Sequence, residues 1–243
     1  MPQSFSLGPV LFHFYGLFLG LGLVASYWYS SRNAKKFNLR QKNIDLCFLF
    51  VIFLALIGAR FYHVADKLEY YKSHFGEIFS LANGGLGIFG ALGFGLWGLF
   101  LAAKLQKISF FAVANLIFPS LLLAQAIGRI GNFFNLEAYG APTNLPWKVI
   151  VNGEGVHPTF FYESVLCLTA FIVYLFLLKK KNFKDFGFAY YLISYGAIRL
   201  FTEFFRTDTW MINGVKLGWL FSTTMLIAGL FFFLKKKKKI HKI

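Results

Sequence analysis

The sequence predicts an all-α polytopic membrane protein with about seven transmembrane helices, and three observations predict it. Hydrophobic residues make up 57% of the 243 residues and charged residues only 14%, a balance too apolar for a soluble domain. Seven stretches are long and apolar enough to cross a bilayer core, which takes about 20 residues. Basic residues gather in short segments between alternate stretches, as they do in cytoplasmic loops.

The seven predicted spans follow one another along a single membrane domain over residues 1–243. The fourth and sixth are the weakest, because polar residues interrupt them. In chain order the spans are Val10–Tyr29, Ile44–Val64, Gly85–Ala103, Phe110–Ile127, Thr159–Leu178, Phe186–Phe205 and Leu217–Leu234. The longest connection, near residues 128–158, is rich in glycine and proline, which predicts a folded outward-facing loop.

The net charge of +15 is distributed as in a membrane protein and not as in a nucleic-acid-binding one. Four short segments hold 17 of the 25 basic residues: Arg32–Lys42, Lys104–Lys107, Lys179–Lys184 and Lys235–Lys242. With seven spans, all four fall on one side, which the positive-inside rule assigns to the cytoplasm. The N-terminus and the other loops then face outward. The terminal lysines are predicted to orient the chain and to touch anionic membrane lipid.

The cysteines predict neither a disulfide nor a metal site. Cys47 and Cys167 both lie inside predicted spans, and no Cys/His cluster has the spacing of a zinc site. We therefore predict a protein without a bound metal or cofactor.

The polar residues that are hardest to explain as structure gather on the predicted outward side. Arg129, Asn132 and Glu137 follow the apolar fourth span directly and lead to Gly140. Charged side chains at membrane depth are costly and mark pathways or sites. The end of the sixth span carries a second group with helical spacing, namely Tyr195, Arg199, Glu203 and Arg206.

Each of these features has a plainer alternative. Arg199 and Glu203 could form an ion pair that merely holds helices together. Two arginines with an acid and a tyrosine on one face instead favour an anion site, because guanidinium forks match phosphate oxygens. Tyr15 is as typical of an interfacial anchor as of a site, and His157 of a structural histidine as of a ligand. The third-span glycines predict either close helix packing or room for a lipid tail.

Taken together, these residues resemble the bacterial prolipoprotein diacylglyceryl transferase family. The family signature Gly-Arg-x-Gly-Asn-Phe-x-Asn-x-Glu, followed shortly by glycine, matches Gly128–Glu137 and Gly140. Other family segments appear in order over nearly the whole chain: Phe5–Pro9 with His13–Gly16, Gly58–Arg60, His157–Pro158 with Tyr162–Glu163, and Tyr195–Arg206.

The resemblance implies an enzyme of the bacterial plasma (inner) membrane with its active site toward the outer leaflet. The family transfers the diacylglyceryl group of phosphatidylglycerol to the lipobox cysteine of preprolipoprotein signal peptides and releases glycerol phosphate. Arg129 and Arg199 then correspond to essential arginines near the lipid phosphate, with Tyr15 and Asn132 as further catalytic residues. The remaining matched or implied substrate-binding residues are Glu137, Gly140, Tyr195, Glu203, Arg206, Arg60 and His157.

One position departs from the family pattern. Phe89 stands where the third-span motif of the family usually has a histidine, which is a candidate general base for the cysteine thiol. Phenylalanine cannot accept a proton, and losing a base costs roughly 10²–10⁴ in rate. Three hypotheses follow: an active transferase relying on arginine electrostatics, a transferase with a different acceptor or lipid donor, and a non-catalytic phospholipid- or lipoprotein-binding relative.

Overall fold

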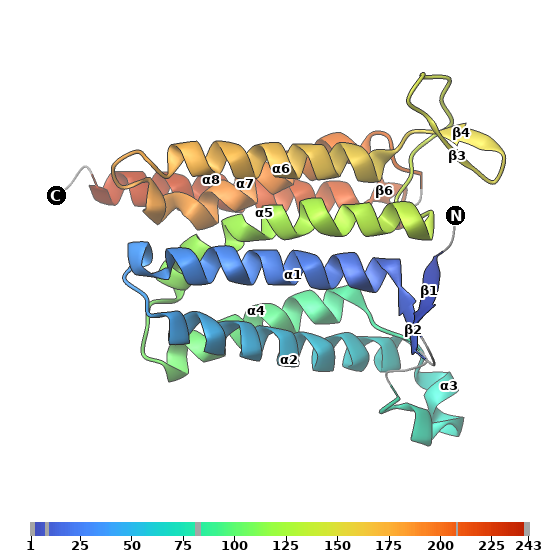
Figure 1. Cartoon of the computed structure of the whole chain (residues 1–243), viewed down its shortest axis with the longest axis horizontal. Coiled ribbons are helices and arrows are strands. Elements are labelled where there is room, and N and C mark those ends of the chain that lie inside the picture. Colours follow the sequence, from blue (N-terminus) through green and yellow to red (C-terminus); the bar gives the residue numbers. More distant parts are fainter. Residues whose placement is uncertain (1–2, 8–9, 81–83, 208, 241–243) are drawn as a thin grey trace. The chain divides into compact units, whose positions relative to one another are not determined.

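The structure, a computed structural model, describes residues 3–7, 10–80, 84–207 and 209–240. Gly8, Pro9 and Lys242, which belong to segments singled out above, lie outside these residues. The described chain is mostly helical (Figure 1). Its α-helices are α1 Phe14–Asn33, α2 Gln41–Asp66, α3 Leu68–Ser73, α4 Ile88–Leu105, α5 Phe110–Asn135, α6 Thr159–Leu177, α7 Gly187–Glu203 and α8 Leu217–Ile240.

Short strands and 3₁₀ turns fill the connections. Three antiparallel strand pairs join β1 Ser4–Leu7 with β2 Val10–His13, β3 Val149–Val151 with β4 Glu154–Val156, and β5 Met211–Ile212 with β6 Val215–Lys216. The 3₁₀ turns are Ala34–Phe37, Phe75–Glu77 and Phe183–Phe186. The predicted first span therefore begins its helix four residues late, because Val10–His13 pairs with Ser4–Leu7 as a strand.

Five of the described helices are long and apolar enough to cross a membrane: α2, α4, α5, α6 and residues Leu217–Lys238 of α8. This finding confirms a mostly helical polytopic membrane protein. The helices α1 and α7 are not among the five, so the count of seven spans and the orientation of the termini stay predictions.

The chain divides into two compact units, residues 31–113 and residues 1–30 with 114–243. In the first unit, α2 packs along α4 through glycines. A Cβ atom on Gly90 would collide with the carbonyl oxygen of Gly58, and one on Gly98 would lie 2.8 Å from the carbonyl oxygen of Phe50. Small residues let helix backbones approach this closely. At Gly90 and Gly98 the structure thus shows the packing alternative raised for the third-span glycines.

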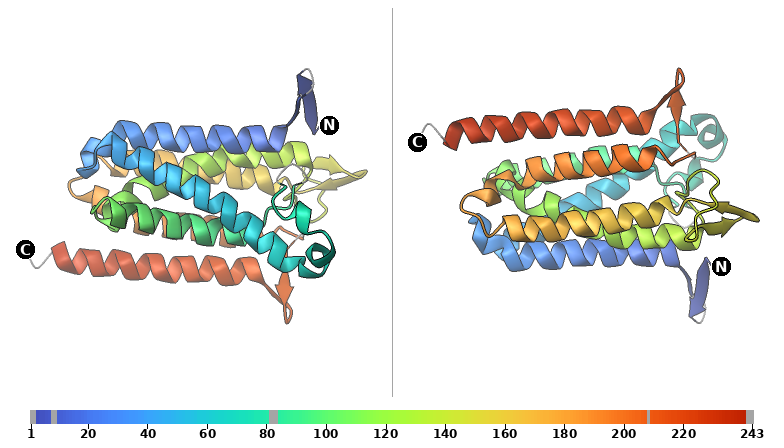
Figure 2. Two further views of the ribbon diagram at one scale, coloured as in Figure 1. Left: turned by 90° about the horizontal axis from the view of Figure 1, so that it is seen from below. Right: turned by 90° about the horizontal axis from the view of Figure 1, so that it is seen from above.

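In the second unit, α7 lies between α6 and α8 (Figure 2, right). The helices α1 and α5 also meet there, and a Cβ atom on Gly22 would lie 2.7 Å from the carbonyl oxygen of Ala124. The buried hydroxyls of Ser26 and Ser30 lie 2.7 and 3.2 Å from that of Ser120. These small and hydroxyl-bearing residues bring the backbones together and satisfy each other's polar groups.

The connection between α5 and α6 is shorter than predicted. Residues 128–135, placed at the start of the loop by sequence, continue α5 to Asn135. A helix satisfies its own backbone hydrogen bonds at membrane depth, and a loop there does not. The hairpin of β3 and β4 follows, turning at Asn152 and Gly153, whose φ angles of 51° and 85° suit the tight turn of a two-residue hairpin loop.

Candidate active site

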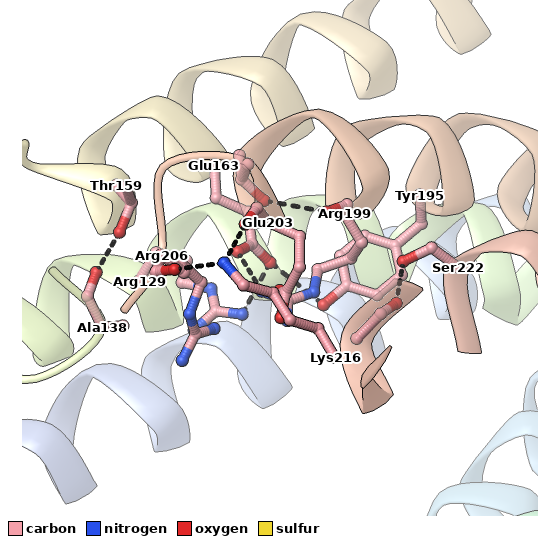
Figure 3. A network of polar contacts seen from close by, with 12 residues as sticks. Arg129, Ala138, Thr159, Glu163, Tyr195, Arg199, Glu203, Arg206, Lys216 and Ser222 are labelled. Atoms are coloured by element: carbon pink, nitrogen blue, oxygen red, sulfur yellow. Dashed lines mark hydrogen bonds and ion pairs between the residues drawn. The ribbon is translucent and has the colours of Figure 1, made fainter. Parts of the chain in front are cut away.

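One buried carboxylate, that of Glu163 in α6, joins the two predicted arginines (Figure 3). Its Oε1 accepts from Arg129 Nη2 at 2.6 Å, and its Oε2 accepts from Arg199 Nη1 at 3.0 Å. The Tyr195 hydroxyl donates to Oε1 at 3.0 Å. Glu163 therefore brings α5, α6 and α7 together at one point, with every oxygen of its carboxylate engaged.

The network continues along α7 to Glu203. Arg199 Nη2 donates to Glu203 Oε2 at 2.9 Å, across the four-residue spacing that sequence predicts to share a face. Within the described residues, the other oxygen of Glu203 is buried without a hydrogen-bond partner. A Cβ atom on Gly218 of α8 would collide with this carboxylate, so glycine is what lets α8 close over it.

Charges alternate along this network, two guanidinium groups with two carboxylates. The carboxylate side chains are 2% and 1% exposed, while those of Arg129 and Arg199 are 20% and 17% exposed. A buried charge is tolerated when it is paired and hydrogen-bonded, and here each acid is paired. A guanidinium has five N–H donors, so bonds to these acids leave each arginine donors for an anionic ligand.

Asn132 lies beside Arg129 of α5, and Tyr15 of α1 lies beside Gly131 in the same turn. Asn132 is buried, and its Oδ1 accepts from Arg129 Nη1 at 3.3 Å. A Cβ atom on Gly131 would lie 3.2 Å from the Cα of Tyr15, so α1 passes close to α5 at this turn. Within one helical turn, Arg129 thus pairs with Glu163, Gly131 lets α1 approach, and Asn132 accepts a hydrogen bond from Arg129.

Gly140 ties the start of the connection to the end of α7. Its amide donates to the carbonyl of His157 at 2.8 Å, and it pairs with Arg206 in an isolated β-bridge. A Cβ atom there would lie 2.5 Å from the carbonyl oxygen of Phe205 and 2.9 Å from the Cβ of His157. Only glycine fits between these strands of chain.

Arg206 lies past the end of α7, not on its face, because the helix ends at Glu203. Lys216 closes that end: its Nζ donates to the carbonyls of Glu203 at 3.1 Å and Arg206 at 2.6 Å. A lysine ammonium satisfies the free carbonyls at a helix C-terminus and complements the helix dipole.

An apolar cavity of about 870 Å³ adjoins the network. Its walls come from α5, the connection after it, α6 and the end of α7, and aromatic rings such as Phe133, Phe161 and Phe201 line it. Arg129 and His157 line the same cavity. An apolar pocket with few polar groups at one end is the usual shape of a ligand site.

Two of the predicted site residues have hydrogen-bond partners of their own. Glu137 is exposed, and its Oε1 accepts from Asn135 Nδ2 at 3.5 Å. Arg60 belongs to the unit of residues 31–113, where its guanidinium donates to the main-chain carbonyls of Ile78, Gly84, Gly85 and Glu77. There it holds the main chain on both sides of the α3–α4 connection, at Ile78 and at Gly84.

Sequence reasoning assigned no role to Glu163 or Lys216. The signal for Glu163 was available, because an acidic residue within the apolar span 159–178 is costly unless paired. Its partners lie 34 and 36 residues away in sequence, so their identity needed the fold. Lys216 had no comparable signal, since a lysine beside a span is ordinary.

Comparison with known proteins gives one consistent result. The family model described as prolipoprotein diacylglyceryl transferase matches residues 2–235. A phosphatidylglycerol–prolipoprotein diacylglyceryl transferase of Finegoldia magna is 35% identical over 240 residues, covering 98% of this chain and 97% of that protein. Proteins of the same name from Clostridioides difficile and Lactococcus lactis are 34% and 33% identical, covering 97% of this chain and 96% and 94% of their own.

Proposed function

The chain belongs to the prolipoprotein diacylglyceryl transferase family, and on this premise we propose that it modifies preprolipoproteins with lipid. It transfers the diacylglyceryl group of phosphatidylglycerol to the cysteine thiol of the lipobox. The products are a thioether and glycerol phosphate. The observation that carries the proposal is the pair of partly exposed guanidinium groups, Arg129 and Arg199, held on the buried carboxylate of Glu163.

The two arginines bind the lipid phosphate and stabilise its departure. As the bond between glycerol and phosphate breaks, negative charge grows on the leaving phosphate, and preorganised cations near it lower the barrier. Glu163 holds both guanidinium groups in place, so little reorganisation is needed when the lipid arrives. The same cations favour the thiolate of an approaching cysteine. Asn132, Tyr195 and Tyr15 support this arrangement.

The other predicted residues act on the shape of the site. Gly140 and Arg206 join the α5–α6 connection to the chain just after the C-terminal end of α7. Glu203 sets the orientation of Arg199. We assign no direct contact with the lipid phosphate to Glu137, whose carboxylate is exposed, and we assign Arg60 to holding the main-chain carbonyls of Ile78 and Gly84.

The site faces the outer leaflet of the bacterial inner membrane in this proposal, within a chain of seven spans whose C-terminus is cytoplasmic. The support is the charge distribution: the segments Lys104–Lys107, Lys179–Lys184 and Lys235–Lys242 fall on one side when α7 crosses. Preprolipoproteins and phosphatidylglycerol both reach that leaflet.

The experiment that tests the function is transfer of labelled diacylglycerol from phosphatidylglycerol to a lipobox peptide by the purified protein. We expect thioether product from the parent and a loss of about 10²–10³ in turnover for Arg129→Lys and Arg199→Lys, because lysine cannot donate two parallel bonds. Lys67→Ala is the matched control, since Lys67 is exposed in the other unit.

The alternatives give different results in the same assay. A new lipid product without labelled peptide would favour a different acceptor. Retained binding of phosphatidylglycerol without turnover in the parent would favour a non-catalytic relative. Rescue of a strain depleted of its own transferase is the cellular check, and failure to rescue despite full membrane expression would count against the proposal.

A further inference from the structure

His157 lines the cavity, and its main chain is held by hydrogen bonds from both its amide and its carbonyl. Its carbonyl accepts from the amides of Gly140 at 2.8 Å and Thr159 at 2.9 Å, and its amide donates to the carbonyl of Ala141 at 3.0 Å. The side chain is therefore anchored on ordered backbone next to the start of α6. Its ring also packs against that of Phe205, with centroids 5.0 Å apart.

The His157 ring is oriented through one nitrogen. Nδ1 lies 3.2 Å from the Tyr162 hydroxyl oxygen, and that oxygen accepts from Trp147 Nε1 at 2.8 Å. A phenolic oxygen has the capacity to accept from both groups. When Nδ1 carries the hydrogen and donates it to Tyr162, the lone pair of the neutral imidazole lies on Nε2. Within the described residues, Nε2 makes no hydrogen bond.

His157 lines the same cavity as Arg129. Among the residues that line this cavity, the titratable side chains are those of Arg129, Tyr162 and His157. An arginine stays protonated, and a tyrosine hydroxyl normally keeps its proton at neutral pH. The nearby carboxylate of Glu163 has both oxygens bound to arginines. Among these side chains, the imidazole of His157 is therefore the one with a nitrogen lone pair that is able to accept a proton.

We propose that Nε2 of His157 accepts the proton of the acceptor cysteine thiol, which makes His157 the general base of the reaction. This inference rests on the proposed function. Sulfur forms its bond to the glycerol carbon of the lipid, and the bond from that carbon to the phosphate oxygen breaks with its electron pair. The proton on Nε2 then passes to the departing glycerol phosphate or to water. Tyr162 accepts from Nδ1–H throughout and so stabilises the imidazolium.

The test compares two acceptor peptides that differ in one atom. A cysteine thiol is mostly protonated at neutral pH, its ordinary pKa being about 8.5, whereas a selenocysteine selenol is already ionised and needs no base. With cysteine, His157→Gln should lose roughly 10²–10⁴ in turnover at saturating lipid, and the KM for phosphatidylglycerol should stay unchanged. With selenocysteine, the loss relative to the parent should nearly vanish. Tyr162→Phe should show the same pattern more weakly.

The control variant is His74→Gln, whose histidine is exposed in the other unit. The thermal unfolding midpoint of each variant in detergent shows that it is folded, and exogenous imidazole should restore activity to His157→Ala. Equal losses with both acceptors, a raised KM with unchanged turnover, or full activity with cysteine would each overturn the inference while leaving the transferase intact. A parent without turnover on either peptide would contradict the proposed function itself.

Discussion

Glu163 shows how one residue decides the geometry of the candidate site. A carboxylate that is 2% exposed and bound to two guanidinium groups is stable only while both are present. The same residue limits how far Arg129 and Arg199 can separate. Glu163 therefore sets the distance between the two guanidinium groups that we propose bind the lipid phosphate.

We predict that Glu163→Gln weakens both stability and catalysis. Glutamine carries no charge, and its NH2 group replaces one of the two oxygens, so that a donor faces one of the guanidinium groups. Buried positive charge is then left unpaired, and breaking such a pair typically costs about 3–5 kcal/mol of the free energy of unfolding. Thermal unfolding in detergent and the transfer assay check the two effects. Glu154→Gln is the matched control, because Glu154 is the exposed first residue of strand β4. A variant as stable and as active as the parent would contradict the role given to Glu163.

The sequence singles out individual charged residues of the candidate site but does not reveal their partners. Arg129, Arg199 and Glu203 stand out in the sequence as candidates because charge within apolar sequence is rare and costly. Their partners could not be predicted, because the pairing of Arg129 with Glu163 depends on how two helices meet, and nothing in local sequence encodes it.

At the scale of elements, glycine contacts position the helices. Gly90 of α4 lies against the backbone of Gly58 in α2, while a Cβ atom on Gly93 would meet nothing within 4 Å. The two glycines are three residues apart on one helix, and only Gly90 lies in contact with the backbone of α2. The density of glycines in the sequence predicts that helices pack closely there. Which of these glycines touches the neighbouring backbone depends on where the two helices cross.

This difference supports a matched prediction for α2 and α4. Gly90→Ala should destabilise the protein by about 1–3 kcal/mol, because an added methyl group pushes backbone away from backbone. Gly93→Ala should be neutral or slightly stabilising, since alanine is the better helix former. Thermal unfolding midpoints in one detergent give the comparison, and equal effects of the two substitutions would refute it.

At the scale of the whole molecule, whether α7 crosses the membrane decides on which side the β5–β6 hairpin and the terminal lysines lie. It has 17 residues and is about 26 Å long at 1.5 Å per residue, somewhat less than the bilayer core of about 30 Å. If it crosses, the hairpin of β5 and β6 is outside and the terminal lysines are in the cytoplasm. If it does not cross, the hairpin stays on the side of Lys179–Lys184.

We therefore predict that Asn213→Cys reacts with an impermeant maleimide in intact cells, while Lys181→Cys reacts only after permeabilisation. Both positions are exposed. The native Cys47 and Cys167 are buried, so the parent protein should not be labelled and serves as the control. Asn152→Cys, in the turn between β3 and β4, should label like Asn213→Cys. Labelling of Asn213→Cys only after permeabilisation would place α7 outside the set of spans.

The sequence by itself determined that this is a helical polytopic membrane protein of the diacylglyceryl transferase type, with arginines as its unusual residues. Composition, hydropathy and a long polar motif carry that information locally, one segment at a time. The tertiary structure alone decided that Glu163 joins the two arginines, that α5 runs on through the motif to Asn135, and that His157 and Arg129 line one cavity. These features depend on contacts between segments far apart in the chain, and such contacts exist only once the helices have packed.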